Sequence, residues 1–370
     1  MKLTAQIKLN PSPEQADALR RTLEAANAAC DAISRTAWAT QTFRQFALHK
    51  LVYYDIRDAF GLAAQLTVRC IAKVADAYKL DTDTLRTFAP LGAVAYDSRI
   101  LAIYPASSTI SMWTLDGLQV IPFVCGERQR ALLASQKGES DVVYRDGSWY
   151  LSATCEAKEA APQVATEALG IDLGVTHIAV DSDGDIHSGK AIKNVRYRHR
   201  RLRTKLQRKG TLGSRRRLRK LAGQERRFAT WVNHNLSKQI VTKAERTKRA
   251  IALEDLTHIR TRIRARRPQR VTLHSWAFLQ LRACIVYKAA LVGVAVHLVD
   301  PRNTSRTCPT CGHCVKENRK TQASFVCTSC GFAGLADAIA AVNIGRRAPV
   351  NVPYCSETGS PVAPEQSPRL

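Results

Sequence analysis

The sequence predicts a multidomain protein of mixed α/β and β class. A small β-barrel with an inserted helical bundle is expected to precede an α/β domain that carries a zinc ribbon. Three observations predict this order. First, the hydrophobic pattern changes from a helical period to a period of two near residue 91. Second, a strand, a hairpin, helices and further strands follow from about residue 167. Third, two C-x-x-C-G knuckles lie within residues 308–331. The length of 370 residues allows several domains.

The N-terminal part begins with a strand-like stretch, residues 2–10, in which apolar and polar side chains alternate. Ser12-Pro13-Glu14-Gln15 then has the sequence of a helix start with a capping box. Leu, Ala and Ile recur at helical spacing to about residue 80, which predicts the bundle. About six short strands follow between residues 93 and 154, with turn signals at Asp116-Gly117 and Asp146-Gly147. These strands, joined by residues 2–10, would form the barrel.

The C-terminal part is organised around residues 170–180, GIDLGVTHIAV, which has the pattern of a short buried strand with one carboxylate, Asp172, before a glycine turn. Asp181-Ser182-Asp183-Gly184 predicts a hairpin. Two long helices broken near Gly210–Gly213 should fill residues 195–247. The remaining expected elements are a strand at 250–253, a flexible basic loop at 260–270, a helix at 276–292, a strand at 294–299 and a helix at 335–347.

The charge of the chain is its most unusual bulk property. Fifty-six Lys and Arg residues against 31 Asp and Glu give a net charge of +25. Such an excess favours a polyanionic partner, most simply DNA or RNA, with an anionic membrane surface as the rival. The sequence contains no apolar run long enough to span a bilayer, and its N-terminus lacks the apolar core of a signal peptide. We therefore expect a soluble intracellular protein.

Basic side chains concentrate in the two long helices predicted after residue 195. Almost no acidic residue separates them before Glu225, so their mutual repulsion favours phosphate contacts over a merely solvated face. The predicted nucleic-acid-binding residues are Arg196, Arg198, Arg200, Arg201, Arg203, Arg215, Arg216, Arg217, Arg219 and Lys220.

Four cysteines have the spacing of a structural zinc site. Cys308 and Cys311 form one knuckle and Cys327 and Cys330 the other, each followed by glycine, and 15 residues separate the two knuckles. This pattern is typical of a four-cysteine zinc ribbon, in which four protein ligands leave no position for catalysis. His313 and Cys314 lack a knuckle glycine and are given no ligand role. The scattered cysteines are expected to be core residues: Cys30, Cys70, Cys125, Cys155 and Cys284.

Three separate carboxylates are candidates for a catalytic metal site. Asp172 lies in an apolar run, Glu254 ends an apolar strand, and Asp337 opens an apolar helix. Hydrolysis of a phosphodiester with two divalent ions requires several carboxylates, and Mg²⁺ prefers such oxygen ligands. Each acid also has a simpler interpretation. Asp172 could form a salt bridge, Asp255 instead of Glu254 could face the site, and Asp337 could interact with its helix N-terminus.

At these residues the chain resembles the TnpB (OrfB) family of transposon-encoded RNA-guided nucleases, which are related to type V CRISPR effectors. Residues 170–180 are similar to the first RuvC motif of that family, and LEDL at 253–256 is similar to the second. Residues 308–344, the cysteine ribbon followed by DAIAAVNI, resemble the third motif with its embedded zinc module. The resemblance covers most of the chain.

The resemblance implies an RNase H-like (RuvC) nuclease domain in which Asp172, Glu254 and Asp337 are catalytic and bind two Mg²⁺ (or Mn²⁺) ions, beside a structural Zn²⁺. It implies cleavage of target double-stranded DNA directed by a guide RNA from the transposon end. The expected location is the cytoplasm of a bacterium or archaeon, in association with the nucleoid. Neither a membrane partner nor a protein oligomer is implied.

The resemblance also divides the chain into domains. These are a β-barrel wedge domain (1–10 and 89–157), a helical recognition domain (11–88), a RuvC-like nuclease domain (167–303 and 332–348), the zinc ribbon (304–331) and a disordered tail (349–370). The third motif departs from the family, because Leu335 and Ala336 replace polar residues and Ile339 replaces an asparagine. Two alternatives remain: a catalytically weak or inactive, repressor-like RNA-guided DNA-binding protein of the same family, and a DNA strand-transfer transposase.

Overall fold

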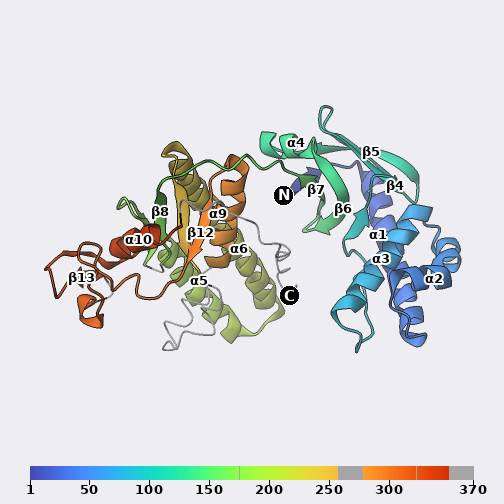
Figure 1. Cartoon of the computed structure of the whole chain (residues 1–370). Coiled ribbons are helices and arrows are strands. Elements are labelled where there is room, and N and C mark those ends of the chain that lie inside the picture. Colours follow the sequence, from blue (N-terminus) through green and yellow to red (C-terminus); the bar gives the residue numbers. More distant parts are fainter. Residues whose placement is uncertain (175, 257–277, 322, 350–370) are drawn as a thin grey trace. The chain divides into compact units, whose positions relative to one another are not determined.

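The computed structural model describes residues 1–174, 176–256, 278–321 and 323–349 (Figure 1). The basic loop expected at residues 260–270 and residues 350–370 of the expected tail lie outside these ranges. The chain divides into two units, Met1–Lys158 and Glu159–Leu370. None of the described helices combines the length and the apolar character that a membrane span needs.

The first unit contains one seven-stranded antiparallel sheet that forms a nearly closed barrel. Its strand order is β2-β6-β7-β1-β5-β4-β3. The first strand pairs with β7 on one side and β5 on the other, which confirms that residues 2–10 join the later strands. The Tyr96 hydroxyl of the end strand β2 donates to the Trp113 carbonyl of β4, the strand next to the other end, at 3.1 Å. The strands are β1 (Lys2–Leu9), β2 (Val94–Tyr96), β3 (Leu101–Tyr104), β4 (Thr109–Thr114), β5 (Gly117–Val124), β6 (Gln136–Arg145) and β7 (Ser148–Glu156).

The helices of this unit share one core with the barrel. They are α1 (Pro13–Ala39), α2 (Gln45–Phe60), α3 (Ala64–Leu80) and α4 (Glu127–Leu133). Ser12 and Gln15 form the predicted capping box at the start of α1. Leu23 and Ile71 of the helices are buried in the same cluster as Ile110 and Leu151 of the strands. The short helix α4 was not predicted, because seven residues give too little periodicity to distinguish a helix from a loop.

The second unit contains a mixed five-stranded sheet with the order β10-β9-β8-β11-β12. The pairs β8–β9 and β9–β10 are antiparallel, whereas β8–β11 and β11–β12 are parallel. The strands are β8 (Ala168–Asp172), β9 (His177–Asp181), β10 (Ile186–Ser188), β11 (Ala250–Glu254) and β12 (Val296–Val299). The helices within the described residues of this unit are α5 (Lys190–Lys209), α6 (Leu212–Arg246), α9 (Phe278–Val292) and α10 (Ala336–Arg346).

Side chains of β8 and β11 alternate between two apolar layers. Leu169, Ile171 and Leu253 are buried with residues of α6 and α9. The opposite face of the sheet packs against α10, where Ala252 is buried with Ile344. Gly170 lies on this α10 face, and a Cβ atom there would come within 1.9 Å of the Ala341 carbonyl oxygen. The close approach of α10 to β8 therefore requires glycine at position 170.

The β9–β10 hairpin is fixed by a buried aspartate. Asp181 accepts hydrogen bonds from the backbone N–H groups of Asp183 and Asp185, and Lys243 Nζ of α6 lies 2.5 Å from its carboxylate. Lys243 also contacts the carboxylates of Asp183 and Asp185. The Lys243 ammonium group thus contacts three acids at the predicted turn, and Arg249 shares the compensation of Asp183.

We predict that Lys243→Met destabilises the protein by about 2–3 kcal/mol, because it leaves the buried Asp181 carboxylate without its cation. The melting temperature should fall by about 5 °C. The measurement is thermal unfolding followed by circular dichroism. Lys238→Met, which removes an exposed lysine from the same helix, is the control and should leave the melting curve unchanged. An equal shift in the two variants would contradict the role given to Lys243.

Candidate metal and nucleic-acid sites

Two of the predicted carboxylates lie side by side at the ends of parallel strands. Asp172 is the last residue of β8 and Glu254 the last residue of β11. The parallel register pairs Ile171 with Leu253, so the two acids follow at the same edge of the sheet. By alternation both share a face with Gly170 and Ala252, the face that α10 covers.

The third carboxylate, Asp337, comes from the first turn of α10 and approaches from the covering helix. Burial, followed by the negative charges of Glu254 and Asp337, raises the pKa of Asp172 to about 8. Burial likewise raises the pKa of Glu254, although the hydrogen bond from Thr304 opposes this. The three acids are therefore brought together. Among the described residues, the four cysteine sulfurs of the ribbon form a group of possible metal ligands within 4.8 Å of one another, and the three carboxylates are not part of such a group.

Glu254, not Asp255, is the residue that faces this carboxylate cluster. Thr304 Oγ1 donates to Glu254 Oε1 at 2.6 Å. Asp255 points to the other face, where Arg282 of α9 lies 3.1 Å from its carboxylate. The sequence left open which of the two acids faces the site, and the alternation of side chains along β11 assigns Glu254.

Three polar residues at the carboxylate cluster were missed in the sequence. His177 Nδ1 lies 2.8 Å from Asp337 Oδ2, Arg319 Nη2 lies 3.7 Å from Asp337 Oδ1, and Thr304 holds Glu254. His177 follows Asp172 by five residues, so its place beside the first motif was a usable signal. Arg319 and Thr304 lie in the long connection between β12 and α10, where the sequence gives no sign of their proximity.

The carboxylate cluster suits divalent cations chemically. Its oxygen donors are those that Mg²⁺ and Mn²⁺ prefer, and burial together with the neighbouring acids makes ionised Asp172 unfavourable without a cation. A pair of ions about 3.5–4 Å apart spreads its ligands more widely than one ion does. Asp172, Glu254 and Asp337 could therefore hold such a pair.

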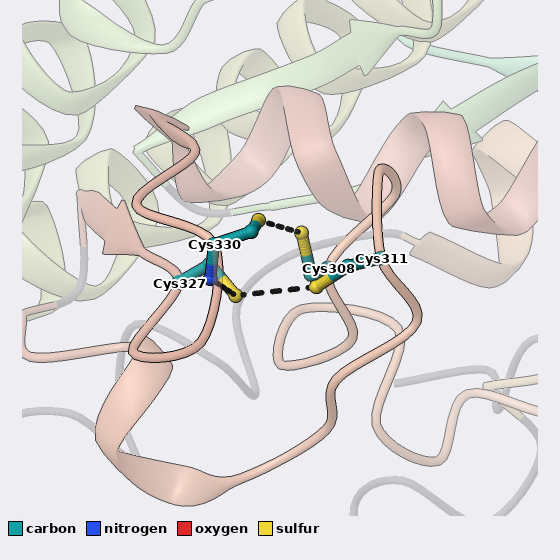
Figure 2. Close-up of side chains that lie close together, drawn as sticks. All are labelled: Cys308, Cys311, Cys327 and Cys330. Atoms are coloured by element: carbon teal, nitrogen blue, oxygen red, sulfur yellow. Dashed lines mark hydrogen bonds between the residues drawn. The ribbon is translucent and has the colours of Figure 1, made fainter.

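The four predicted zinc-ligand cysteines converge on one point (Figure 2). The sulfurs of Cys308 and Cys330 are 3.7 Å apart and those of Cys311 and Cys327 are 3.6 Å apart. A tetrahedral zinc ion with Zn–S bonds of about 2.3 Å needs sulfurs about 3.8 Å apart, so the cluster could hold zinc. Cys314 is exposed and lies outside the cluster, as predicted.

The backbone of the two knuckles favours the ionised form of the cysteine sulfurs. Gly312 and Gly331 both have a φ of 74°, which closes the tight turn after each pair of cysteines. Burial opposes ionisation of Cys308, but backbone N–H groups of Cys311 and Thr310 and the neighbouring cysteine side chains lower its pKa to about 6. Although its backbone hydrogen bond opposes this, the neighbouring sulfurs raise the pKa of Cys330. Thiolates are the form that binds zinc, so the turn geometry favours metal binding.

The ribbon also contacts α10. The segment between β12 and α10 contains a short 3₁₀ turn, η1 (Lys316–Asn318), and the paired strands β13 (Ser324–Val326) and β14 (Ala333–Leu335), of which β14 lies just after the predicted ribbon bounds. Ala336 and Ile339, two of the departures from the family motif, are buried in a small core with Cys308 and Phe325. These apolar side chains therefore fasten the ribbon to the helix that carries Asp337.

The basic residues predicted to bind nucleic acid lie on α5 and α6, which are broken at Gly210 with a φ of 65°. Most are exposed to solvent: Arg198, Arg200, Arg201, Arg215, Arg216, Arg217, Arg219 and Lys220. Arg203 pairs with Glu225 and ties α5 to α6. Arg196 is half-buried, and burial lowers its pKa. Tyr197 and Trp231, 63% and 64% exposed, add aromatic faces to the same two helices.

Comparison with known proteins supports the sequence resemblance. Residues 152–258 match the OrfB family model, described as a probable transposase, and residues 278–344 match the model of the Cas12f1-like TNB domain. The CRISPR-associated endodeoxyribonuclease Cas12f1 of Sulfoacidibacillus thermotolerans is 39% identical over 118 residues, which are 32% of this chain and 26% of that protein. The chain is thus a relative of the OrfB transposases and the Cas12f effectors.

Two further relatives are named for the same group. The TnpB-like protein MJ0751 of Methanocaldococcus jannaschii is 28% identical, over 53% of this chain and 70% of its own. The putative RNA-guided DNA endonuclease InsQ of Escherichia coli is 26% identical, over 54% of this chain and 53% of its own. The resemblance to the TnpB (OrfB) family is therefore confirmed. The chain spans less than two thirds of the matched Cas12f1 and InsQ.

A solved structure shows the same fold over nearly the whole chain. The mini-RNA-guided endonuclease CRISPR-Cas phi3 aligns with 94% of this chain and 92% of its own, with a TM-score of 0.56 and 10% sequence identity. At this identity the match concerns the fold alone.

Proposed function

We propose that the protein is a transposon-encoded, RNA-guided DNA endonuclease that hydrolyses phosphodiesters at a RuvC-like site. The observation that carries the proposal is the meeting of Asp172, Glu254 and Asp337, from three distant segments, on one face of the mixed sheet. The strand order, in which β8 lies in the centre between the antiparallel strands β9 and β10 and the parallel strands β11 and β12, supports an RNase H-like nuclease domain. The names of the relatives support DNA as the substrate and RNA as the guide.

The residues of the cluster have separate roles in this proposal. When bound, two Mg²⁺ or Mn²⁺ ions would activate a water molecule and stabilise the departing oxygen. Asp172 and Glu254 would hold them from the rigid ends of β8 and β11, and Asp337 would do so from α10. Thr304 fixes the orientation of Glu254 through its hydrogen bond to Oε1. The Arg319 guanidinium offsets part of the negative charge of the cluster.

The other parts of the chain would bind the nucleic acids. The barrel (1–10 and 89–157) and the bundle (11–88) are proposed as wedge and recognition domains for guide and duplex. Residues 167–303 and 332–348 would form the nuclease domain, with the ribbon (304–331) holding zinc through Cys308, Cys311, Cys327 and Cys330. Both a guide RNA from the transposon end and a target duplex are implied as partners, in the cytoplasm.

The exposed basic residues of α6 are proposed to contact phosphates. We predict that replacing Arg216, Arg219 and Lys220 together by glutamine lowers the slope of log affinity against log salt by about 2–3, since each lost contact removes about 0.7–0.9. The measurement is fluorescence anisotropy with labelled nucleic acid over a range of salt. The control replaces Lys238, Arg246 and Lys248, exposed residues at the other end of the helix region. If both triple variants lowered the salt slope equally, the change would follow from net charge alone, and the proposed phosphate contacts of α6 would be contradicted.

The proposed activity is tested with protein purified together with co-expressed transposon-end RNA. Duplex DNA matched to the RNA is offered with Mg²⁺, and the products are separated by size. Cuts that require both the matching guide and the metal support the proposal. Guided binding without cuts would favour the repressor, and joined strands formed without RNA would favour a strand-transfer transposase; either result would overturn the endonuclease assignment.

A further inference from the structure

His177 makes the closest polar contact of Asp337 across the carboxylate cluster. It is the first residue of β9, directly after the turn that follows Asp172. A Cβ atom at Gly174 would lie 2.8 Å from the His177 carbonyl oxygen, so the turn closes tightly only with glycine. This turn places His177 Nδ1 2.8 Å from Asp337 Oδ2, although 160 residues separate the two in the sequence.

Asp337 needs such a contact more than the other two acids do. Asp172 and Glu254 extend from paired strands, whereas Asp337 stands in the first turn of α10, a helix whose N-cap residue, Leu335, makes no side-chain hydrogen bond. A carboxylate at this position is attracted to the free N–H groups of its own helix, and rotation about χ1 would carry it away from the cluster. An external hydrogen-bond donor opposes that rotation.

The two oxygens of Asp337 have different surroundings. Oδ2 is held by His177, while Oδ1 lies 3.7 Å from the Arg319 guanidinium, whose charge also acts on Asp172 and Glu254. Both side chains of the His177–Asp337 pair are largely buried, 23% and 17% exposed. Limited access of water strengthens the hydrogen bond and restricts both rotamers.

We propose that His177 is a positioning residue of the metal site: it donates from Nδ1 to Asp337 Oδ2 and so presents Oδ1 to the ions. The inference rests on the proposed function, because it takes Asp337 as a metal ligand. A hydrogen-bond partner that orients a ligand typically changes metal affinity by about 10–100-fold when it is removed.

Substitutions at His177 separate hydrogen bonding from packing. In His177→Asn the amide nitrogen takes nearly the place of Nδ1 and can still donate, whereas His177→Leu fills the space without a donor. His297→Leu is the control, since His297 lies half-buried on β12 and its pKa is lowered by burial alone. Mn²⁺ binding to the purified protein without nucleic acid is measured by electron paramagnetic resonance, with zinc content and melting temperature as folding checks.

We expect His177→Leu to weaken Mn²⁺ binding by about 10–100-fold, while His177→Asn and His297→Leu bind within about threefold of the unsubstituted protein. Unchanged binding by His177→Leu would overturn the inference, and so would equally weak binding by His177→Asn. Failure of the proposed function gives a different result: Mn²⁺ binding by the unsubstituted protein would then be no stronger than that of Asp172→Ala.

Discussion

Replacing Asp172 with alanine is expected to lower guide-dependent DNA cleavage by about 10³-fold or more, with little loss of nucleic-acid affinity. Asp172 is buried at the end of β8, and burial, followed by the charges of Glu254 and Asp337, raises its pKa. Its loss would remove a ligand from the rigid end of β8. Single-turnover cleavage rates and guide-RNA affinity are measured on the same preparations, so that chemistry and binding are separated.

The adjacent acids of β11 provide a matched pair of controls for this result. Glu254→Gln, on the cluster face, should be as impaired as Asp172→Ala. Asp255→Asn changes the neighbouring acid, which faces α9 and pairs with Arg282, and should cut at nearly the normal rate. If Asp255→Asn lost cleavage and Glu254→Gln retained it, the orientation of β11 in the proposed mechanism would be wrong.

Replacing Cys308 with serine is expected to unfold the ribbon as well as to abolish cleavage. A structural zinc ion contributes about 10–16 kcal/mol of apparent binding free energy to a small module at neutral pH. The ribbon core otherwise consists of a few side chains around Phe325, too few to order it without the ion. Zinc content should fall from one ion per chain to nearly none, and protease cuts should appear within residues 304–331.

Loss of the ribbon would also reach the carboxylate cluster. Arg319 and Thr304 contact Asp337 and Glu254 from this segment, and Ile339 joins its core to α10. Cys314→Ser is the control, because Cys314 lies in the same segment but is exposed and outside the four-sulfur group. A Cys308→Ser protein that kept its zinc and its protease resistance would refute the structural role of the cysteine cluster.

The sequence was sufficient for the features that depend on local pattern. The knuckles are encoded by cysteine and glycine spacing, and the helix break by Gly210, whose left-handed conformation suits glycine. Each acid could be located at the end of an apolar strand or helix. The pairing of the strands could not be predicted from the sequence. The parallel neighbours β8 and β11 are separated in the chain by α5 and α6, and their register follows from packing between distant residues.

The departures at Ala336 and Ile339 show the same limit. In the sequence they stand as apolar substitutions in a motif with polar residues, with no indication of a reason. In the fold both are buried against Phe325 of the ribbon. His177 stands beside the first motif in the sequence, but its contact with Asp337 appears only in the fold. Arg319 gives no signal in the sequence and gains its role through its contact with Asp337.

Iron-directed cleavage of the polypeptide tests most directly whether three distant carboxylates share divalent ions. Fe²⁺ can replace Mg²⁺ at oxygen ligands, and with ascorbate and peroxide it cuts the backbone only near its site. We predict cuts adjacent to Asp172, Glu254 and Asp337 in the same protein, suppressed by excess Mg²⁺ and absent from Asp172→Ala. Cuts near only one of the three residues, or cuts that persist in Asp172→Ala, would contradict the shared site.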